Sequence, residues 1–566
     1  MKIFFSSFFG VISGLLFLVL LVIGLASIPS GKIEIAPKST LVLDLNGVIQ
    51  DRPTNSLALL SELLDQPEPL SLTQTLLAMD AARKDDRIEA LHIHIGLFEM
   101  GYASIQELRT AIQALEAAGK PVSVQAKIYS QKAIYLARAA SHVQIVPEGM
   151  VEISGLSASP LYLKGALDKA GIQAHLIRGS DNIYKSAGEP FIAEIMSEAN
   201  RLQIQERLQS IWSQIHNDWV ADGLDGDALE TRLMVSPLFD AEEAKHFGLV
   251  DQISYTLNLD EEAESISVAD YYRALEEPSA RQSIAVLIAE GDVQDGNGSD
   301  GVITDGSLRK AIKKISKQKR VGAILLRINS PGGSALASDM IWGALSDVTD
   351  KPIIVSMGDV AASGGYYIAA PAQEIYASPA TITGSIGVFG LLFSGEQLMH
   401  EHLGIRSQPV GSHPFSTALQ LDQAPSEAFM AIMQKNVDHT YDRFKNVVAQ
   451  GRKMERQRVD SLAQGHVYSG RDALSLGLVD REGGFLAALG RARELAGYTN
   501  DARIVFYPED MDPIEEFINS LSSNINQSWS AWIGGPAQEW LNALQAEWAH
   551  LEQRQGIQMR AIDLNL

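Results

Sequence analysis

Two short segments of the chain place a nucleophile and a base in settings that could activate them. Ser363 lies in Gly358–Tyr367, where small residues flank the serine on both sides. Lys185 lies far earlier, in Asn182–Pro190, among apolar residues and next to a proline. A neutral lysine can take the proton of a serine hydroxyl, and the activated oxygen can attack a carbonyl carbon. The two segments therefore suggest a hydrolase in which a lysine, rather than a histidine, activates the serine.

The residues around Ser363 predict a tight turn between a strand and a helix. The apolar stretch Ile353–Met357 predicts a strand that breaks at glycine, and Tyr366–Ala370 predicts the following helix. A helix N-terminus offers free N–H groups and the positive end of the helix dipole. These groups could hold an oxyanion, and Gly364 would let a substrate approach the backbone closely. A serine that only caps the helix is the structural alternative, and the segment alone does not decide between them.

A second glycine-rich loop, Asn329–Ser334, also follows an apolar stretch. The carboxyl ends of parallel strands meet at one edge of a sheet, where ligands bind, so we expect this loop beside Ser363. An oxyanion needs donors from more than one segment, and Gly332, Gly333 and Gly364 are the candidates. A plain surface loop is the alternative for the glycine pair.

Lys185 can act as a base only if its pKa falls from about 10.4 toward neutrality. Burial among apolar neighbours would lower the pKa, whereas the nearby carboxylate of Glu189 would raise it. Ser385, in the segment Ala380–Gly387, could hydrogen-bond the amine and orient it, or it could belong to an ordinary serine–glycine turn. A histidine base remains an alternative without a supporting motif. The histidines that could serve are His400, His402, His413, His439 and His466.

The chain carries the same pattern of predicted strands and helices twice. Leu41–Asp51 matches Ile284–Asp295, and both halves end in the residues Gly-Leu-Val-Asp. Strands that alternate with helices at these spacings predict βαβ units and parallel sheets, and hence an α/β fold. The first copy has no counterpart of Ser363, and the second has no counterpart of Lys185. We therefore expect one active site that is divided between the two copies.

The composition narrows the class of protein. The chain has 566 residues, a formal net charge of -23 and no cysteine. The acidic charge argues against nucleic-acid binding, which needs a basic surface. The absence of cysteine excludes disulfides and thiolate metal sites. The chemistry expected of a serine and a lysine requires neither a metal nor an organic cofactor.

Four parts are predicted along the chain. They are an anchor at residues 1–30, an N-terminal repeat at 40–260 that supplies the lysine, a C-terminal repeat at 280–500 that supplies the serine, and a helical extension at 501–566. Ile3–Ile28 is uncharged and long enough for a transmembrane helix, although Gly24–Ala26 resembles a signal-peptide cleavage site. The extension holds four of the seven tryptophans. Their spacing is typical of a helix packed on another domain or subunit, or on a membrane surface.

Taken together, these motifs resemble the signal peptide peptidase A (protease IV) family, peptidase family S49, in its long duplicated form. The resemblance rests on Asn329–Ser334, Ala361–Tyr367, Thr383–Gly387, Lys185–Ala187 with Glu189–Phe191, and Gln464–Val467. It implies tandem Clp-protease or crotonase-like repeats of ββα type, with Ser363 as nucleophile and Lys185 as general base. Gly188 departs from the family pattern, in which a larger apolar residue is expected.

The resemblance also implies partners and a location. It implies a homotetramer, anchored in the bacterial inner membrane with its catalytic body on the extracytoplasmic side. Its substrates would be signal peptides left in the membrane after preprotein cleavage. Two other functions stay open. A crotonase-like acyl-CoA enzyme would use the same oxyanion geometry, although it would not explain the anchor or the Lys–Ser pair. A non-catalytic membrane scaffold is the other alternative.

Overall fold

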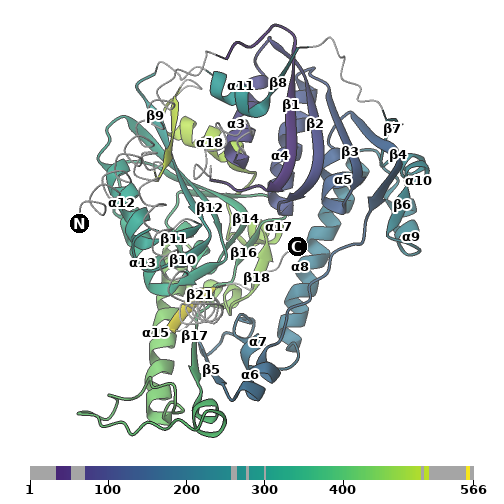
Figure 1. The fold of residues 1–566 in the computed structure, drawn as a ribbon. Helices are drawn as coiled ribbons and strands as arrows, with labels where there is room; N and C mark the ends of the chain where they lie inside the picture. Colours follow the sequence, from purple (N-terminus) through teal and green to yellow (C-terminus); the bar gives the residue numbers. More distant parts are fainter. Residues whose placement is uncertain are drawn as a thin grey trace, which may run out of the picture.

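The computed structural model of the protein describes residues 33–52, 71–255, 264–275, 280–298, 301–498, 502–508 and 556–560. The strands form three sheets, two of them mainly parallel and flanked by helices (Figure 1). The α/β class with parallel sheets is therefore confirmed. The predicted anchor and the four tryptophans of the extension lie outside the described residues. Within those residues, no helix combines the length and the apolar composition that a membrane span requires.

The first half of the chain builds a sheet with strand order β6-β4-β3-β2-β1-β8, and β7 pairs with β4. Its strands are β1 (Ser39–Val48), β2 (Ile88–Glu99), β3 (Val122–Tyr129), β4 (His142–Glu152), β6 (Leu238–Asp240), β7 (Gln252–Ile253) and β8 (Ser265–Ser267). The helices of this half are α3 (Leu72–Ala82), α4 (Tyr102–Ala117), α5 (Gln131–Ala137), α6 (Lys164–Ala170), α7 (Glu189–Ile192), α8 (Glu198–Ala221), α9 (Gly226–Leu233), α10 (Ala241–His246) and α11 (Val268–Ala274). The central strands are parallel, as βαβ connections require.

The second half builds a similar sheet with order β18-β16-β14-β12-β9-β20, in which β15 pairs with β14 and β19. Its strands are β9 (Ser283–Glu290), β12 (Val321–Ser330), β14 (Ile353–Ala362), β15 (Glu374–Ala377), β16 (Ile382–Gly384), β18 (Val467–Ser469), β19 (Arg481–Glu482) and β20 (Arg503–Tyr507). The helices are α12 (Asp305–Ser316), α13 (Ala335–Ser346), α14 (Gly364–Ala369), α15 (Glu427–Gly451), α16 (Arg456–Leu462), α17 (Gly470–Leu476) and α18 (Phe485–Leu495), with a π-helix at Leu398–His402.

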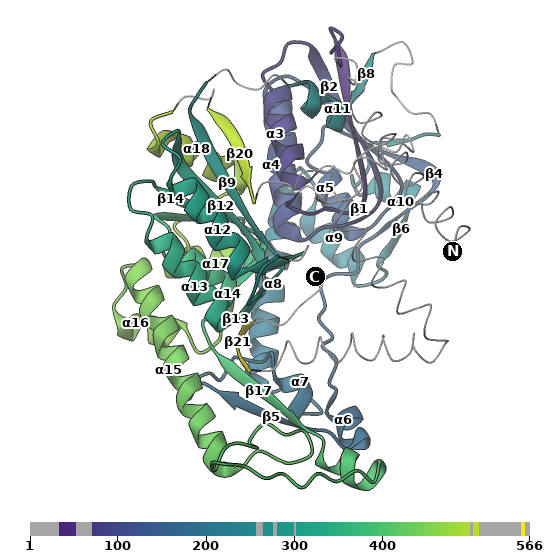
Figure 2. The same cartoon turned by 60° about the vertical axis from the view of Figure 1, so that its left-hand side comes forward.

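Strand β9 shows how the two halves pack together. Its residues are almost all buried, as expected for a parallel strand covered on both faces. Ile284 and Val286 join the core of the first half, whereas Ala285 and Leu287 join the core of the second. Because successive side chains of a strand point to opposite faces, one face of this sheet packs on the N-terminal half. Figure 2 shows α3 and α4 between the two large sheets.

A third sheet, of order β11-β10-β13-β21-β17-β5, joins segments that are far apart in the sequence. Its strands are β5 (Gln173–Arg178), β10 (Asp292–Gln294), β11 (Val302–Thr304), β13 (Gly332–Ser334), β17 (Phe389–Ser394) and β21 (Gly556–Arg560). Strand β5 pairs antiparallel with β17, so the first half of the chain reaches into the second just before Lys185. In both views β5, α6 and α7 extend away from the N-terminal sheet (Figure 1, Figure 2).

Candidate active site

The structure brings Lys185 and Ser363 together. A hydrogen bond of 2.7 Å joins Lys185 Nζ and Ser363 Oγ. The same nitrogen lies 2.9 Å from Ser385 Oγ and donates to the Ser385 carbonyl oxygen at 3.1 Å. All three side chains are buried, with exposed fractions of 1% or less. The amine therefore has three fixed partners, and the hydroxyl of Ser363 is within reach of direct proton transfer.

The second half of the chain holds the Lys185 segment in place. After β5, the Asn182 side chain donates to the Val388 carbonyl oxygen at 2.8 Å. The Tyr184 N–H donates to the Gln464 carbonyl oxygen at 3.0 Å. Gly465 has a φ of +77°, and a Cβ there would lie 2.6 Å from Lys185 Cβ. A side chain at position 465 would therefore push the lysine out of its place.

Burial sets the charge state of the lysine. Desolvation disfavours the ammonium form and lowers the pKa of Lys185 well below its ordinary value. The expected opposing effect of Glu189 is wrong, because burial alone accounts for the lowered pKa of Lys185. The Glu189 carboxylate has other partners. Glu189 Oε1 accepts from Ser197 Oγ at 2.5 Å, and Oε2 accepts from Asn200 Nδ2 at 3.3 Å. A neutral amine is the form that can accept the proton of a serine hydroxyl.

The small residue at position 188 also has a physical reason. A Cβ on Gly188 would lie 2.3 Å from Leu176 Cδ1, so the leucine of β5 fills the space that a larger side chain would need. This apolar cluster contains Phe191, Phe389 and Leu391, with Leu176 packed against it. The departure from the family pattern is therefore matched by a neighbour on an adjacent strand.

Ser363 lies at the junction of β14 and α14 with a backbone that few residues adopt. Its φ is +55°, in a region that is unfavourable for a residue with a side chain. Its N–H donates to the Gly384 carbonyl oxygen at 2.8 Å, while its side chain makes no capping hydrogen bond to α14. The capping alternative is therefore wrong. The predicted strand break at Gly358 is wrong too, because β14 continues to Ala362 and delivers Ser363 directly.

The candidate oxyanion donors lie beside the nucleophile. A Cβ on Gly364 would lie 3.2 Å from Gly333 N, 3.2 Å from Gly332 Cα and 2.6 Å from Ser338 Oγ. The loop and the helix start are therefore packed so closely that only glycine fits at position 364. Gly332 N–H already donates to Ser330 Oγ at 3.2 Å. As the first residue of α14, Gly364 has no partner for its N–H within the helix.

The histidine alternative finds no support in the geometry. Within the described residues no histidine nitrogen hydrogen-bonds Ser363. His466 follows Gly465, which contacts Lys185, and its ring packs edge-on against Tyr184 with centroids 4.5 Å apart. Its Nε2 lies 3.4 Å from a carboxylate oxygen of Glu206. It supports the turn that contacts Lys185 and does not reach the serine.

Strand β21 lies against the candidate oxyanion loop, and no sequence pattern indicated it. Gly332, Gly333 and Ser334 pair antiparallel with residues 558–560, and Phe389–Leu391 pair antiparallel with residues 556–558. A peptide segment from the C-terminal extension therefore occupies the space between β13 and β17. Helix α14, which begins beside Ser363, contacts the same strand. No local motif marks residues 556–560 as a strand, because both pairing partners are distant in sequence.

Comparison with known proteins identifies the class. Residues 114–268 and 347–499 match the family model of Peptidase family S49, once in each half. The chain is 31% identical to Protease 4 of Salmonella typhi, over 94% of this chain and 91% of the relative. It is 30% identical to Protease 4 of Haemophilus influenzae, over 92% and 90%. It is 32% identical to a putative signal peptide peptidase SppA of Enterococcus faecium, over 57% and 89%.

These matches show that the protein is a serine protease. It belongs to peptidase family S49, and the resemblance found in its motifs is confirmed. Among solved structures, a ClpP1 mutant from Listeria monocytogenes covers 36% of this chain at 16% identity and a TM-score of 0.24. A mutant of a membrane-bound stomatin-specific protease covers 41% at 16% identity and a TM-score of 0.27.

Proposed function

We propose that the protein cleaves peptide bonds with Ser363 as nucleophile and Lys185 as general base, and that signal peptides left in the membrane are its substrates. The observation that carries this proposal is the 2.7 Å contact between Lys185 Nζ and Ser363 Oγ in a fully buried site. The substrate class rests on the resemblance and on a relative that bears the name signal peptide peptidase.

The reaction follows from the positions of these groups. Neutral Lys185 accepts the proton of Ser363, and Ser363 Oγ forms a bond to the carbonyl carbon of the substrate. The carbonyl oxygen becomes an oxyanion, held by N–H groups of the Gly332–Gly333 loop and of Gly364. Lys185 returns the proton to the leaving amine, and the C–N bond breaks. Water then attacks the acyl-enzyme, with Lys185 again accepting and returning the proton.

Ser385 has a role in this scheme. During the reaction Lys185 is transiently an ammonium in a buried site, and an ammonium needs hydrogen-bond acceptors there. Ser385 Oγ and its carbonyl oxygen, at 2.9 and 3.1 Å, can accept two of the three N–H bonds. We propose that Ser385 orients the amine and stabilises its charged form.

Ser385→Ala is therefore expected to lower kcat by about 10- to 100-fold and to leave KM nearly unchanged, because one hydrogen bond to a charged group is lost. Steady-state cleavage of a fluorogenic peptide measures both constants. Ser378→Ala, which truncates another buried serine near the end of β15, is the matched control. An unchanged kcat in Ser385→Ala would rule out this role.

We propose that the space between β13 and β17, which β21 fills, is the substrate groove. We infer that a peptide substrate binds there as an extended strand between β13 and β17, since β21 already pairs with both walls. Main-chain pairing on two sides gives affinity that tolerates many sequences. The buried Phe389 and Leu391 lie on the β17 wall, and Phe191 packs with them. Such a groove suits apolar peptides.

If β21 competes with substrate for this groove, deletion of residues 556–566 is expected to lower KM for short apolar peptides at least about threefold. A tethered segment competes at a high effective concentration, and its removal ends that competition. The synthetic peptide Gly-Ile-Gln-Met-Arg should inhibit the shortened protein. A control that lacks only residues 561–566 retains the strand and should keep the original KM. Equal KM for both deletions would contradict competition by β21.

Digestion of a synthetic signal peptide in detergent micelles tests the proposed function as a whole. We expect internal cleavage products by mass spectrometry with the wild-type chain and none with Ser363→Ala. A crotonase-like enzyme would instead convert an acyl-CoA thioester and leave the peptide intact, and a scaffold would do neither. Either of those two results would contradict the proposal.

The resemblance also supports an inner-membrane homotetramer with its body on the extracytoplasmic side and Clp-protease or crotonase-like repeats. We propose this assembly, with the apolar segment Ile3–Ile28 as its anchor. Light scattering of the detergent-solubilised chain should give the protein mass of four 61.5 kDa chains, and the protein should float with lipid vesicles. A monomer, or a chain that stays in the aqueous fraction, would contradict it.

A further inference from the structure

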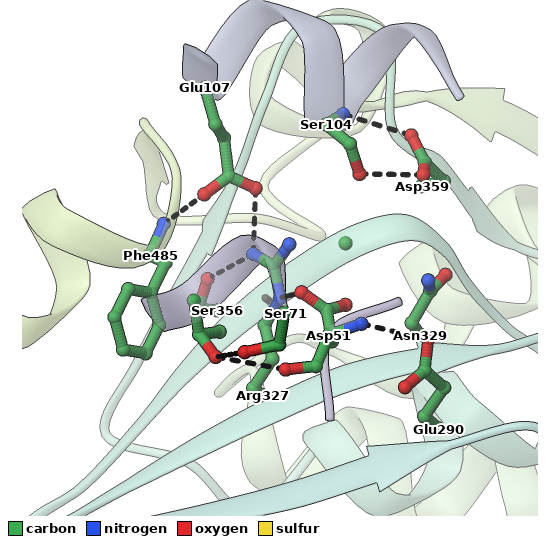
Figure 3. Close-up of polar contacts among 12 residues, drawn as sticks. Asp51, Ser71, Ser104, Glu107, Glu290, Arg327, Asn329, Ser356, Asp359 and Phe485 are labelled. Atoms are coloured by element: carbon green, nitrogen blue, oxygen red, sulfur yellow. Dashed lines mark hydrogen bonds and ion pairs between the residues drawn. The ribbon is translucent and has the colours of Figure 1, made fainter. Parts of the chain in front are cut away.

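Three neighbouring strands of the C-terminal sheet carry, at or near their C-terminal ends, charged residues that all contact the N-terminal half. Glu290 of β9 accepts from the N–H groups of Asp51 and Arg52 at 3.1 and 3.0 Å. Arg327 of β12 reaches into the first half, and Asp359 of β14 does the same. Figure 3 shows these residues at one junction between the two halves. Two of these strands, β12 and β14, lead into the candidate oxyanion loop and into Ser363.

Arg327 forms the buried centre of this junction. Its side chain is fully buried and donates to Asp51 Oδ1 at 2.9 Å and to Glu107 Oε1 at 2.7 Å. Glu107 Oε2 in turn accepts from the Phe485 N–H at 2.6 Å. Substituting Arg327 would leave two buried carboxylates without their counter-charge, so such a variant would be severely destabilised. Arg327 is thus unsuitable for separating a catalytic effect from a folding effect.

Asp359 is the junction residue nearest to the nucleophile in sequence, on β14, the strand that ends one residue before Ser363. Its carboxylate accepts from Ser104 Oγ at 2.6 Å, Ser104 N–H at 2.9 Å and Gly101 N–H at 3.2 Å. These groups form the N-terminus of α4, where backbone N–H groups lack helical partners and the dipole favours an anion. A Cβ on Gly101 would lie 2.2 Å from Asp359 Cγ, so the contact requires glycine there.

The same strand end is tied to the oxyanion loop. Asn329 Oδ1 accepts from the Val360 N–H at 3.1 Å. A Cβ on Gly358 would lie about 3 Å from Asn329 and from Asp51 Oδ2, so these two side chains leave little room for a larger residue at position 358. The Asp359 carboxylate therefore links helix α4 to the end of β14. That strand end is hydrogen-bonded to the candidate oxyanion loop and leads into Ser363.

We propose that Asp359 is a positioning residue. Through it, helix α4 of the N-terminal half fixes the end of β14, and this sets the position of Ser363 relative to Lys185 and the oxyanion donors. The inference rests on the proposed role of Ser363. In this arrangement the N-terminal half supplies both the base and a second, rigid contact that sets the position of the nucleophile. Displacement of a reacting atom by a fraction of an ångström lowers the rate of the chemical step more than it lowers binding.

Asp359→Ala in the full-length protein is expected to lower kcat by about 10- to 100-fold with KM within about threefold of wild type. Asp359→Asn keeps an acceptor for the Ser104 N–H and should retain more of kcat than the alanine variant. Ser104→Ala should reduce kcat in the same direction, and the double variant Ser104→Ala/Asp359→Ala should lose no more than Asp359→Ala alone. Steady-state cleavage of a fluorogenic peptide gives these constants.

Asp240→Ala is the matched control, because Asp240 also caps a helix of the N-terminal half, with Oδ1 accepting from the Glu243 N–H at 2.8 Å. It should lower the unfolding temperature as Asp359→Ala does and leave kcat unchanged. Equal kcat values for Asp359→Ala and wild type, or an equal loss in Asp240→Ala, would overturn the positioning role. Covalent labelling of the wild type at Ser363 separates the positioning role of Asp359 from the proposed role of Ser363. If the labelling fails, the proposed nucleophile itself is contradicted.

Discussion

Lys185→Met is expected to lower kcat/KM for peptide cleavage by at least about 10³-fold, the upper range for loss of a general base that acts with a nucleophile. Methionine has a similar length and fills the buried space, but it cannot accept the proton of Ser363 at the 2.7 Å contact. Initial rates on a fluorogenic peptide, measured with enough enzyme to detect slow turnover, give the ratio.

The control for this variant is Lys351→Met. Lys351 is also buried, two residues before β14 and at the opposite end of that strand from Ser363, where its Nζ donates to the Ser316 carbonyl oxygen at 3.1 Å and to Asp350 Oδ2 at 2.6 Å. Lys351→Met should keep kcat/KM within a few-fold of wild type. A histidine-based serine protease would survive Lys185→Met, so substantial activity in that variant would favour the histidine alternative.

The lowered pKa of Lys185 gives the same variant a second, pH-dependent signature. Burial holds the native pKa well below the ordinary value, while the unfolded chain regains a pKa of about 10.4. Between these two values the unfolded state binds more protons, so wild-type stability rises with pH. Unfolding temperatures at pH 7, 8 and 9 should therefore rise for wild type relative to Lys185→Met. Activity should rise with pH as the amine loses its proton.

Ser363→Ala is expected to abolish turnover to a similar or greater extent, because no other group takes the place of the attacking oxygen. The loss should not add to that of Lys185→Met, since residues that act as one unit give non-additive effects. Ser378→Ala is again the control, and circular dichroism should show both variants folded. Losses that multiply in the double variant would mean that the two residues act independently.

The candidate catalytic residues could be predicted from the sequence because the chain is duplicated. The two copies show which segments of the α/β fold correspond, and the differences between them single out the segments of Ser363 and Lys185. The glycines of Asn329–Ser334 and Gly364 mark places where backbone groups approach closely, and the structure packs them together. Local patterns suffice here because strand, turn and helix starts are set by neighbouring residues.

The features that were missed depend on partners that are distant in sequence. The end of β14 was predicted to break at Gly358 and Asp359, but α4 supplies hydrogen bonds to Asp359 and the strand continues. Glu189 was expected to raise the pKa of Lys185, but burial lowers that pKa and the Glu189 carboxylate accepts hydrogen bonds from Ser197 and Asn200. Strand β21 pairs with β13 and β17, which are distant from it in sequence. Single-sequence patterns do not contain such pairings.

Mass mapping of a peptidyl fluorophosphonate adduct tests the Ser363–Lys185 pair most directly. The phosphonyl group reacts with an activated serine oxygen and expels fluoride, so the modified peptide identifies the nucleophile. The wild-type protein should carry one adduct, on the peptide that contains Ser363, and Lys185→Met should react at least about 10³-fold more slowly. An adduct on a different serine, or a Lys185→Met protein labelled at the wild-type rate, would contradict the dyad.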